Sequence, residues 1–539
     1  VMLSCDVEKQ QLQVRLEPPG VPRELQDLDI VSCQFVRDNA QLQFSSVLLE
    51  VAPEENTLFF RFPKRLDKLW ARSTLRYNYD HETAPQVEVF TPITPDQPLI
   101  RTVMNLSPNG LCFWADAQRD LLFRGMHLDR LELRLNNGQQ VTLKGEIRYL
   151  GPRDLEVPPD RIPCGIQFRE VSALDHHRLV TYLISKNFPR VSDATPEDEE
   201  PLWTFLERGD FYTPAKRQEC LGEPEEVRET HARMLNADAG FSRKLVFRDS
   251  GVIYGTVALQ QIYQHTWLVH HLCAMRHRSD FVPRHLLLFL GEYISKTPEI
   301  DYIKMMWRPN NTWSNKIFGR LVHRLHDGEQ SVVKVYSYLH RREAPLPPPH
   351  PEEAAWHIRP ISGDEVIELE SHFIQQEEFF LMKSEDLFRG DLGLERLDAR
   401  YKSLGLFRER KVFVAFDGGR LAGFTLVERA SPGLNLSNLL NAFQVHIAIG
   451  DPERVPALKR ALIRRAIQYY ASHGQRRSIA LTEESDLTAY QAMGFEKVKE
   501  YISWTFDHNI ANIYNLYCYY IFRLYERIEA QRSARRVQV

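Results

Sequence analysis

The stretch ARSTLRYNYD, residues 71–80, holds two arginines four positions apart, and MNLSPNGLCF, residues 104–113, follows about thirty residues later. The first stretch is too short and too rich in tyrosine for an obvious amphipathic helix. The second is a polar turn with a glycine between two apolar runs, a pattern typical of the reversal between two strands. These two segments therefore predict β-structure in which a pair of arginines lies across a strand from a polar turn.

Short runs of partly alternating polarity surround both segments. DLDIVSCQFV and AQLQFSSVLLEV precede them, and LELRLNNGQQVTLKGEIRYL follows as two runs about a turn, the pattern of a β-hairpin. Regularly spaced strands of this kind are typical of β-barrels. We predict a small β-barrel over residues 1–68 and a second barrel over residues 69–187, which closes with an amphipathic helix.

Composition and charge narrow the class of protein. A chain of 539 residues should hold several domains, and 43% apolar with 26% charged residues is ordinary for a soluble globular protein. The net charge of −4 argues against general nucleic-acid binding. Seven scattered cysteines without a C-x-x-C motif favour reduced thiols over a zinc site or disulfides. We find neither a long apolar run nor a secretion signal, and therefore expect a cytoplasmic protein without a transmembrane segment.

Two stretches have the composition of linkers. Residues 188–200 are acidic and contain proline, and residues 343–353 form a proline-rich spacer that we expect to be extended rather than packed. The pieces that they delimit, 201–342 and 354–506, each run hairpin, strand, helix, strand, helix, strand, with an Asp-x-Gly turn in the hairpin. We predict two α/β domains with mixed sheets, followed by a C-terminal helix and basic tail over residues 507–539.

The arginine pair and the polar turn suit an anionic ligand that carries a guanine. A guanidinium group is permanently charged and planar, and it can clamp a phosphate or the O6 and N7 atoms of guanine. The asparagine and serine of the turn supply short hydrogen-bonding side chains, and its glycine leaves the backbone open to a ligand. Taken singly, Arg72 and Arg76 would be surface charges and NLSPNG an ordinary loop; together they predict a guanine-nucleotide site.

Arg72-x-x-x-Arg76 followed by Asn105-x-Ser107-x-x-Gly110 resembles the signature of the PilZ domain, the bacterial receptor for cyclic di-GMP. The segment IPCGIQFREVSALDHHRLVTYLISK also resembles the closing strand and helix of that family, so the resemblance spans roughly residues 69–187. It implies that the two arginines hold phosphates and a guanine of cyclic di-GMP. It also implies that Asn105, Ser107 and Gly110 surround another guanine face.

Residues 1–68 resemble the small barrel that precedes PilZ in flagellar-brake proteins. This resemblance implies that the arginine pair lies at a hinge between two barrels. We expect the hinge to be flexible without ligand and to be drawn over the turn when a dianionic ligand binds. The chain departs from the family in carrying about twenty-eight residues between the two motifs, which implies a long β-loop there.

The order of strands and helices in both repeats resembles the GNAT acyltransferase fold, and AYQAMGFEKV is similar to its Tyr-x-x-x-Gly-Phe ending. The resemblance implies that the pyrophosphate of an acyl-CoA binds N–H groups of a glycine-rich loop at a helix N-terminus. The first repeat has MRHRSDFVPRHLLL, without a glycine. The second has a lone Gly450, two prolines that lack N–H groups, and Asp451 and Glu453 where phosphates would lie. Both loops therefore look poor for CoA.

Single residues of the repeats leave catalysis open. Tyr490 matches the family position that can protonate the leaving thiolate, whereas the first repeat has Phe318, which cannot. A packed aromatic side chain is the commoner outcome for such a tyrosine. His270, His271 and His277 flank the loop of the first repeat without an Asp or Cys at metal spacing, so we assign them no role and expect no metal.

Together these patterns predict a bacterial cyclic di-GMP effector. Its repeats would form a degenerate GNAT-like module that binds a protein partner in motility, biofilm or envelope processes, through the repeats or the tyrosine-rich C-terminal helix. The arginine-rich tail leaves recruitment to a membrane or a motility machine open. The alternative is a cyclic di-GMP-gated N-acyltransferase that uses acyl-CoA or an acyl carrier protein, with Tyr490 as the acid.

Overall fold

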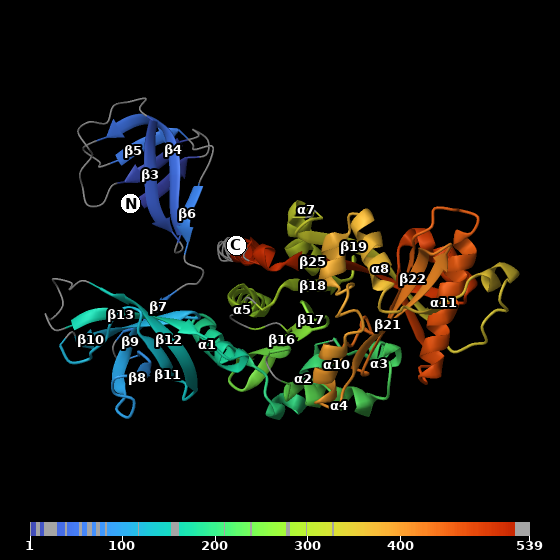
Figure 1. Ribbon diagram of the computed structural model, residues 1–539, viewed down its shortest axis with the longest axis horizontal. Helices are drawn as coiled ribbons and strands as arrows, with labels where there is room; N and C mark the ends of the chain where they lie inside the picture. The colour runs from blue at the N-terminus through green and yellow to red at the C-terminus, as the bar shows by residue number, and fades with distance from the viewer. Residues whose placement is uncertain are drawn as a thin grey trace, which may run out of the picture. The chain divides into compact units, whose positions relative to one another are not determined.

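The computed structural model divides the chain into two compact units, Val1–Asp175 and His176–Val539 (Figure 1). The described residues are 2–6, 11–15, 30–37, 40–52, 57–61, 67–71, 76–80, 83–116, 118–151, 161–209, 211–237, 240–275, 277, 281–297, 299–325, 328–511 and 513–522. No helix among them is long and apolar enough to cross a membrane.

The first unit opens with a six-stranded antiparallel sheet. Its strands are β1 (Met2–Asp6), β2 (Gln11–Arg15), β3 (Ile30–Arg37), β4 (Ala40–Ala52), β5 (Thr57–Arg61) and β6 (Asp67–Ala71). They follow the order β1-β2-β5-β4-β3, and β6 pairs with β4. The long β4 pairs with β3 and β6 in its first part and with β5 in its last part, where Leu48 and Phe60 are fully buried.

The remaining strands of the first unit form a closed six-stranded barrel. The barrel strands are β8 (Gln86–Phe90), β9 (Leu99–Ser107), β10 (Gly110–Asp116), β11 (His127–Arg134), β12 (Gln140–Leu150) and β13 (Arg161–Arg169). The order β10-β13-β12-β11-β8-β9 closes because β9 also pairs with β10, and the short β7 (Tyr77–Asn78) adds to β9. The predicted hairpin over residues 131–150 is confirmed as β11 and β12.

Residues predicted to link the barrel to the repeats contribute to the core of the second unit. Helix α1 (Ala173–Ser185) belongs to that unit from His176 on, and its Val180 and Ile184 lie in the main core together with Phe188 and Val191. The segment 188–200 therefore has side chains to bury, contrary to our expectation. It also forms β14 (Val191–Asp193), whose Asp193 accepts two hydrogen bonds of 2.8 Å from Arg243.

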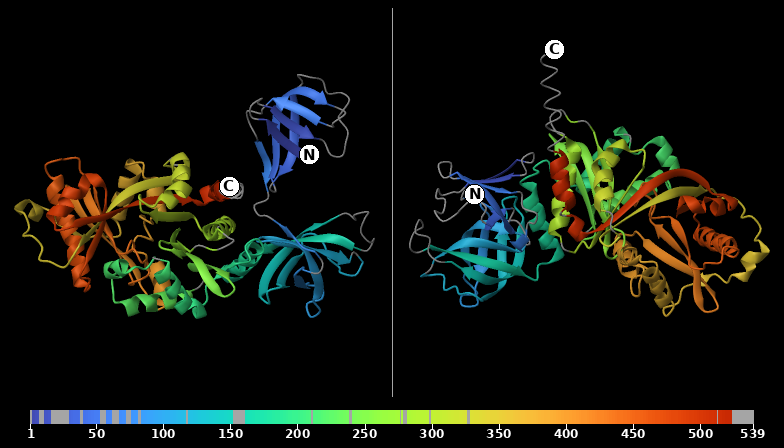
Figure 2. Two further views of the ribbon diagram at one scale, coloured as in Figure 1. Left: turned by 180° about the vertical axis from the view of Figure 1, so that it is seen from behind. Right: turned by 90° about the horizontal axis from the view of Figure 1, so that it is seen from above.

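One twelve-stranded mixed sheet runs through the second unit (Figure 2). After β14 its strands are β15 (Ser242–Asp249), β16 (Val252–Gln261), β17 (Thr266–Ala274), β18 (Tyr302–Trp307), β19 (Ser331–Arg341), β20 (Arg359–Pro360), β21 (Arg408–Asp417), β22 (Arg420–Ala430), β23 (Phe443–Ile447), β24 (Ser478–Thr482) and β25 (Glu496–Asp507). The two repeats share this sheet, where the sequence had predicted a sheet for each.

The repeats are joined by an exchange of their last strands. The sheet order is β14-β15-β16-β17-β18-β25-β19-β24-β23-β22-β21-β20, so β25 of the second repeat pairs with β18 of the first. In the same way β19 of the first repeat pairs with β24 of the second, and β19 and β25 pair with each other along ten residue pairs. Trp504 of β25 is fully buried at this seam and donates a hydrogen bond of 2.7 Å to the hydroxyl of Ser331.

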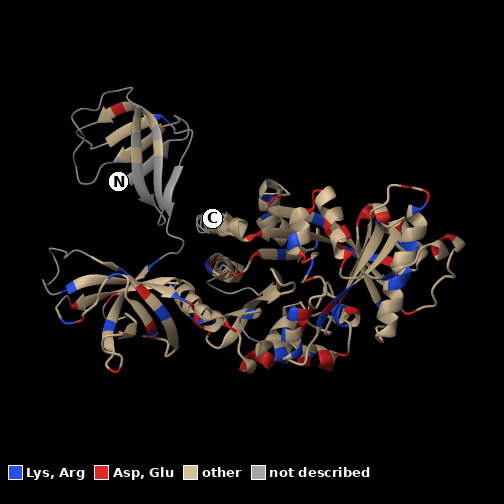
Figure 3. Cartoon of the chain, in the orientation of Figure 1, with Lys and Arg blue, Asp and Glu red and all other residues tan. Residues whose placement is uncertain are grey.

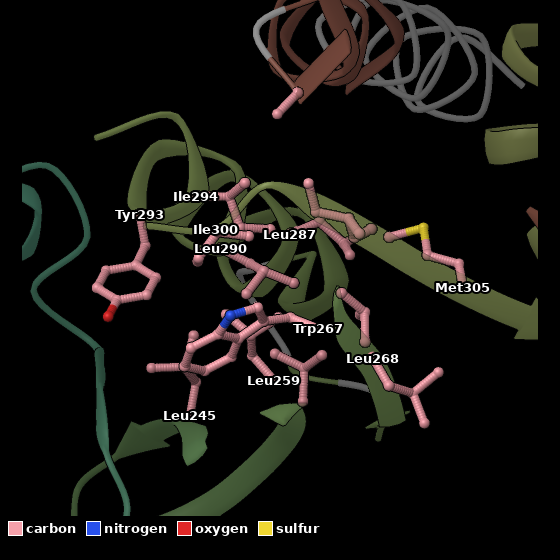
Figure 4. Close-up of a cluster of buried hydrophobic side chains, with 14 of the residues drawn as sticks. Leu245, Leu259, Trp267, Leu268, Leu287, Leu290, Tyr293, Ile294, Ile300 and Met305 are labelled. Atoms are coloured by element: carbon pink, nitrogen blue, oxygen red, sulfur yellow. The ribbon is translucent and has the colours of Figure 1, made fainter. Parts of the chain in front are cut away.

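Helices cover both faces of the sheet. They are α2 (Glu199–Arg208), α3 (Pro214–Glu219), α4 (Pro224–Leu235), α5 (Val282–Lys296), α6 (Thr312–Ser314), α7 (Arg320–Leu325), α8 (Val366–Gln375), α9 (Phe379–Ser384), α10 (Glu395–Lys402), α11 (Val455–Ser472) and α12 (Leu487–Ala492), with a π-helical turn η3 (Asn315–Gly319) between α6 and α7. Figure 4 shows Leu245 and Trp267 of the sheet near Leu287 and Leu290 of α5 in the main core.

The duplication is visible in matching details of the two hairpins. In hairpin β15–β16 and in hairpin β21–β22 the register shifts between the two residues that precede the aspartate of the turn. Six residues after that aspartate each has a glycine, Gly255 or Gly423, against which a long helix packs. A Cβ atom there would lie 2.9 Å from Leu286 of α5 in the first case and 3.2 Å from Leu458 of α11 in the second. Both glycines thus let a helix lie close to the sheet, and at Gly423 a Cβ atom would in addition lie 2.8 Å from the carbonyl oxygen of His446 in β23.

The proline-rich segment packs on the second repeat, contrary to the expectation of an unpacked spacer. It continues into the 3₁₀ helix η4 (Pro351–Ala355), and Glu353 is buried between Arg460 and Arg464 of α11 at 3.1 and 2.9 Å. Arg464 also donates to the carbonyl of Pro347 at 2.8 Å. The arginines of α11 thus hold this segment in place.

Residues 508–511 and 513–522 are helical and pack on their own unit. Tyr514, Cys518 and Phe522 recur every four residues and are buried in the main core. The opposite side of the helix exposes Leu516 and Tyr520.

A buried ionic cluster ties elements of the two repeats together. Arg408 and Arg410 are almost completely buried and bind the two carboxylate oxygens of Glu428 at 2.5 and 2.9 Å. Tyr263 of the first repeat donates to the same carboxylate at 3.0 Å. Burial opposes ionisation of Glu428, but the two guanidinium groups outweigh it and hold its pKa at about 2. Elsewhere in this unit acidic and basic residues are interspersed (Figure 3).

We predict that Trp504→Ala loosens both repeats at once. Removing a fully buried tryptophan costs about 3–5 kcal/mol, and here it also strips a partner from Ser331. Hydrogen exchange should speed up in β18 and in β24 together, although β24 pairs with β19 and not with β25. Trp313→Ala, at a partly buried helical position, is the control and should leave both strands protected. Loss of protection in β18 alone would contradict the coupling.

Candidate functional site

A bulge in β9 brings the polar residues of the predicted motif to one side of the barrel wall. The register between β9 and β10 shifts between Cys112 and Phe113, which leaves an extra residue in β9. Val103 and Leu106 are therefore both fully buried in the interior although they are three positions apart in the strand. Asn105 and Ser107 consequently face the other side together, since side chains alternate along a strand.

Strand β7 aligns Arg76 with this polar side. Tyr77 pairs with Leu106 and Asn78 with Asn105, and the N–H of Tyr79 donates to the carbonyl of Met104 at 2.9 Å. Continuing this antiparallel register by one residue places Arg76 opposite Ser107. Arg76 is exposed, so its long side chain can reach a ligand lying over the hairpin.

Electrostatics also place the guanidinium of Arg76 near the β9–β10 hairpin. Burial raises the pKa of the Cys112 thiol, and the charge of Arg76 acts in the opposite direction on it. Cys112 is the cross-strand partner of Asn105. The arginine, the thiol and the asparagine thus belong to one neighbourhood on the wall.

The turn between β9 and β10 is held by its own hydrogen bonds. The hydroxyl of Ser107 donates to the carbonyl of Gly110 at 3.1 Å, and the carbonyl of Asn109 accepts from the N–H of Phe168 in β13 at 2.9 Å. A Cβ atom on Gly110 would overlap the carbonyl oxygen of Ile166. Gly110 is therefore needed for the close approach of β13, a reason that differs from the ligand access that we expected.

Asn105 offers an acceptor that the described residues leave open. Its Oδ1 atom is buried and has no hydrogen-bond partner among the described residues. A buried amide oxygen without a partner is unfavourable, so a ligand donor at this point would restore a lost hydrogen bond. Arg72 lies outside the described residues. Asn78, which the sequence reasoning missed, pairs with Asn105 and is exposed, and its position two residues after Arg76 in an extended segment was the available signal.

In the second repeat the loop at the N-terminus of α11 uses its own donors. The N–H groups of Arg454 and Val455 both donate to the carbonyl of Asp451 at 3.2 Å, and that of Glu453 donates to the carboxylate of Asp451 at 3.1 Å. Pro452 and Pro456 have no N–H group. A pyrophosphate would have to break these turns to be bound here.

Tyr490 lies where strands β23 and β24 separate. These strands share a single pair, Phe443 with Ala480, and the hydroxyl of Tyr490 is buried there without a hydrogen-bond partner among the described residues. The side chain is fully buried and packs against Phe443 and Phe495. Burial raises its pKa further above the usual range of tyrosine, so in this conformation it is a poor proton donor.

The histidines of the first repeat have separate positions. His277 is buried beside Asp249 at 3.0 Å, whereas the rings of His270 and His271 lie 4.0 Å apart in β17. Among the described residues no group of three or more His, Cys, Asp or Glu side chains is placed to hold a metal ion.

We predict that Gly110→Ala destabilises the barrel. The new methyl group must push against backbone of β13, and overpacking of this kind costs about 1–3 kcal/mol. Thermal unfolding of the full chain, followed by hydrogen exchange in β10 and β13, measures the loss. Gly450→Ala is the control, because a Cβ atom there meets nothing within 4 Å. Equal stability of the two variants would contradict the close approach.

Solved structures of two kinds match parts of the chain. An inhibitor of motility from Bacillus subtilis is 17% identical over 34% of this chain and 87% of its own, with a TM-score of 0.23. The protein YcgR from Escherichia coli, in complex with c-di-GMP, is 14% identical over 33% of this chain and 75% of its own, with a TM-score of 0.24. A tandem GNAT protein from the clavulanic acid biosynthesis pathway is 11% identical over 59% of this chain and 98% of its own, with a TM-score of 0.33.

No family model and no curated protein matches the sequence. The chain is thus similar, in different parts, to structures from PilZ-type cyclic di-GMP receptors and from tandem GNAT proteins, the two families that its motifs resemble.

Proposed function

We propose that the chain is a cyclic di-GMP effector and that the outer wall at β7, β9 and β10 binds the dinucleotide. One observation carries the proposal: β7 aligns Arg76 opposite Ser107, next to the buried Oδ1 of Asn105, which has no hydrogen-bond partner in the described part of the chain. A permanent cation and an open acceptor thus lie on the same side of the barrel. Cyclic di-GMP offers phosphates and guanine acceptors to the arginine, and it offers guanine N–H donors to the amide oxygen of the asparagine.

Each residue has a distinct part in this proposal. Arg76, with Arg72 four residues before it, grips phosphate and the O6 and N7 edge of a guanine. Asn105 accepts from a guanine N–H group, and Ser107 adds a hydroxyl once the ligand competes for its bond to Gly110. Gly110 keeps β13 close behind the turn, so it fixes the wall on which the ligand lies.

The layout that we propose is sensor followed by output. The sheet of residues 2–71 and the PilZ-type barrel form the sensor, and the GNAT-like repeats with the C-terminal helix form the output. The loop of Asp451, whose donors are already used, supports a binding role for the repeats rather than transfer of an acyl group from CoA. A protein partner in motility, biofilm or envelope processes is the output that we propose.

Calorimetric titration of the full chain with cyclic di-GMP tests the site. Arg76→Ala should lose a charge-assisted clamp worth about 2–3 kcal/mol, which weakens binding about 30- to 150-fold. Asn105→Ala should weaken binding less, by about 1–2 kcal/mol, because the lost bond is to a neutral group. Arg119→Ala is the matched control: Arg119 is exposed and lies beyond the far end of β10. Binding as tight in Arg76→Ala as in the wild type would overturn this placement.

A cyclic di-GMP-gated N-acyltransferase remains a second candidate, on one observation. The hydroxyl of Tyr490 lies at the point where β23 and β24 separate, which is where an acid could meet a thioester placed between the strands. For this role the tyrosine must become exposed, since it is fully buried in the structure.

Thermal stabilisation by acyl donors distinguishes the two candidates. For a binding module we expect no shift in Tm with acetyl-CoA, long-chain acyl-CoA or an acyl carrier protein, each added with and without cyclic di-GMP. An acyl donor at a hundred times its Kd would add about 2.7 kcal/mol to the stability. A shift of that size that depends on Tyr490 and on cyclic di-GMP would favour the enzyme.

A further inference from the structure

A small cavity in the first repeat lies over the sheet beside helix α4. Lys244 of β15, Ala258 of β16 and His270 of β17 are direct cross-strand neighbours in one row, so their side chains project from the same face. The alanine in the middle is too short to fill the row. His231 of α4 and Gly433 of the loop after β22 cover the gap, which leaves a cavity of about 20 Å³, room for about one water molecule.

The second repeat fills the corresponding space. Counted from the aspartate of each hairpin turn, Lys244 corresponds to Val412 and Ala258 to Leu426. Val412 and Leu426 are cross-strand neighbours and pack in an apolar cluster. The fold itself therefore accepts two ordinary apolar residues at these positions, and the lysine with its cavity is a property of the first repeat alone.

A strained backbone brings a second histidine to the cavity. The register between β16 and β17 shifts between Thr256 and Ala258, and His271 has a φ of 52°, in the left-handed region. Consecutive side chains of a strand normally point to opposite faces, yet the rings of His270 and His271 lie 4.0 Å apart. The ring of His231 also stacks on that of His271, with 5.3 Å between the ring centroids. Strain of this kind persists where the surrounding structure enforces it, and functional sites are enriched in it.

The polar neighbour of the Lys244 amine is a histidine nitrogen and not a carboxylate. Its one polar partner in the described part of the chain is the Nδ1 atom of His231, at 3.3 Å, and no carboxylate there lies within 4 Å. The Nε2 atom of His231 faces the carbonyl of Gly433 at 2.9 Å and so carries the proton, which leaves Nδ1 as an acceptor toward the lysine. Without a counter-charge, burial shifts the protonation equilibrium of this amine toward the neutral base.

The ionisable groups around the lysine do not compete for this proton at neutral pH. Burial lowers the pKa of Lys244 to about 8. It lowers the pKa of His270 to about 3 and also lowers the pKa values of His231 and His271, in each case with a further contribution from the charge of Lys244. All three rings therefore stay neutral while the lysine titrates within about one unit of physiological pH.

We propose that Lys244 takes up carbon dioxide as a carbamate, which would make the first repeat a site of reversible lysine modification. The neutral Nζ atom attacks the carbon of CO₂ and forms a new N–C bond, while one C=O π-bond pair moves onto oxygen. The nitrogen then releases one proton to water, because the ring of His231 stays neutral. The product is a lysine carbamate beside a neutral imidazole, and no oxidant, reductant or metal is needed.

The size of the cavity selects this class of electrophile. A linear three-atom molecule is small enough for the space over Ala258, and both of its oxygens stay on the new carbamate, whereas a sugar aldehyde or an acyl thioester is too large. The amide of Asn435, which is buried and donates to Nδ1 of His270 at 3.3 Å, is close enough to the rings to turn toward the new anion.

Trapping of the carbamate in the full-length protein tests the proposal. The protein is equilibrated with ¹³C-labelled bicarbonate and CO₂ at pH 8, treated with triethyloxonium to ethylate carbamates, and digested for mass spectrometry. At this pH an amine with a pKa near 8 has a free-base fraction roughly a hundred-fold above that of an ordinary lysine. We expect labelled Lys244 at least about ten-fold above Lys411, an exposed lysine of β21 that serves as the internal reference.

Two variants test the amine and the cavity separately, and each introduces the residue that the second repeat has at the corresponding position. Lys244→Val removes the amine and should abolish the label, whereas Ala258→Leu keeps the amine, fills the cavity and should reduce the label at least about ten-fold. If Lys244→Val fails to fold, the wild type and Ala258→Leu still decide. Labelling of Lys244 no greater than that of Lys411 would overturn the proposal, and so would undiminished labelling in Ala258→Leu. A pH midpoint above 10 for the labelling would also overturn it.

Discussion

The pairing of β19 with β25 is the constraint on which the whole second unit depends. Each strand lies at the end of its own repeat in sequence and in the middle of the shared sheet in space. Without β25 the inner edge of β18 has no partner strand, and without β19 the inner edge of β24 has none. Their backbone N–H and C=O groups would then be unpaired, which is unfavourable for buried groups. The two hydrophobic faces, the ionic cluster of Glu428 and the docked helix after β25 all build on that central pair.

On this shared frame the two repeats have diverged in chemistry. Where the second repeat packs Val412 against Leu426, the first has a lysine beside a hole. Conversely, the second repeat keeps a tyrosine at the separation of its strands, but the loop next to it satisfies its own donors through Asp451. Equal folds with unequal side chains are the general case, since function is carried by individual sites. In the first unit, the wall of β7, β9 and β10 is the site that we propose.

Local features were predictable from the sequence, because neighbouring residues determine them. The hairpins with Asp-x-Gly turns, the closed barrel and the order of elements within each repeat follow from polarity patterns and turn residues. The exchange of strands was not predictable, since a repeat with its own last strand and one with its neighbour's last strand have the same local pattern. Residues 188–200 looked like a linker because their acidic character hides Phe188 and Val191, which are buried.

The candidate site divides in the same way. The motif located Arg76, Asn105 and Ser107, and the structure brings them to one side of the wall through a bulge that no residue pattern announced. Gly110 is required by the backbone of β13, which lies more than fifty residues away in sequence, and its part in ligand binding stays a prediction. The sequence could not predict the row of Lys244, Ala258 and His270, because cross-strand register and not sequence spacing brings these side chains together.

The exchanged strands also bear on how the chain is made. A ribosome releases the first repeat in full once β19 has emerged, yet the inner edge of β18 stays without its native partner until residues 496–507 have been synthesised. An N-terminal domain usually completes its fold before the next domain is synthesised. The first repeat of this protein cannot do so. Nascent first repeats on one messenger carry the same open edge, so the cell must keep them apart until the last strand arrives.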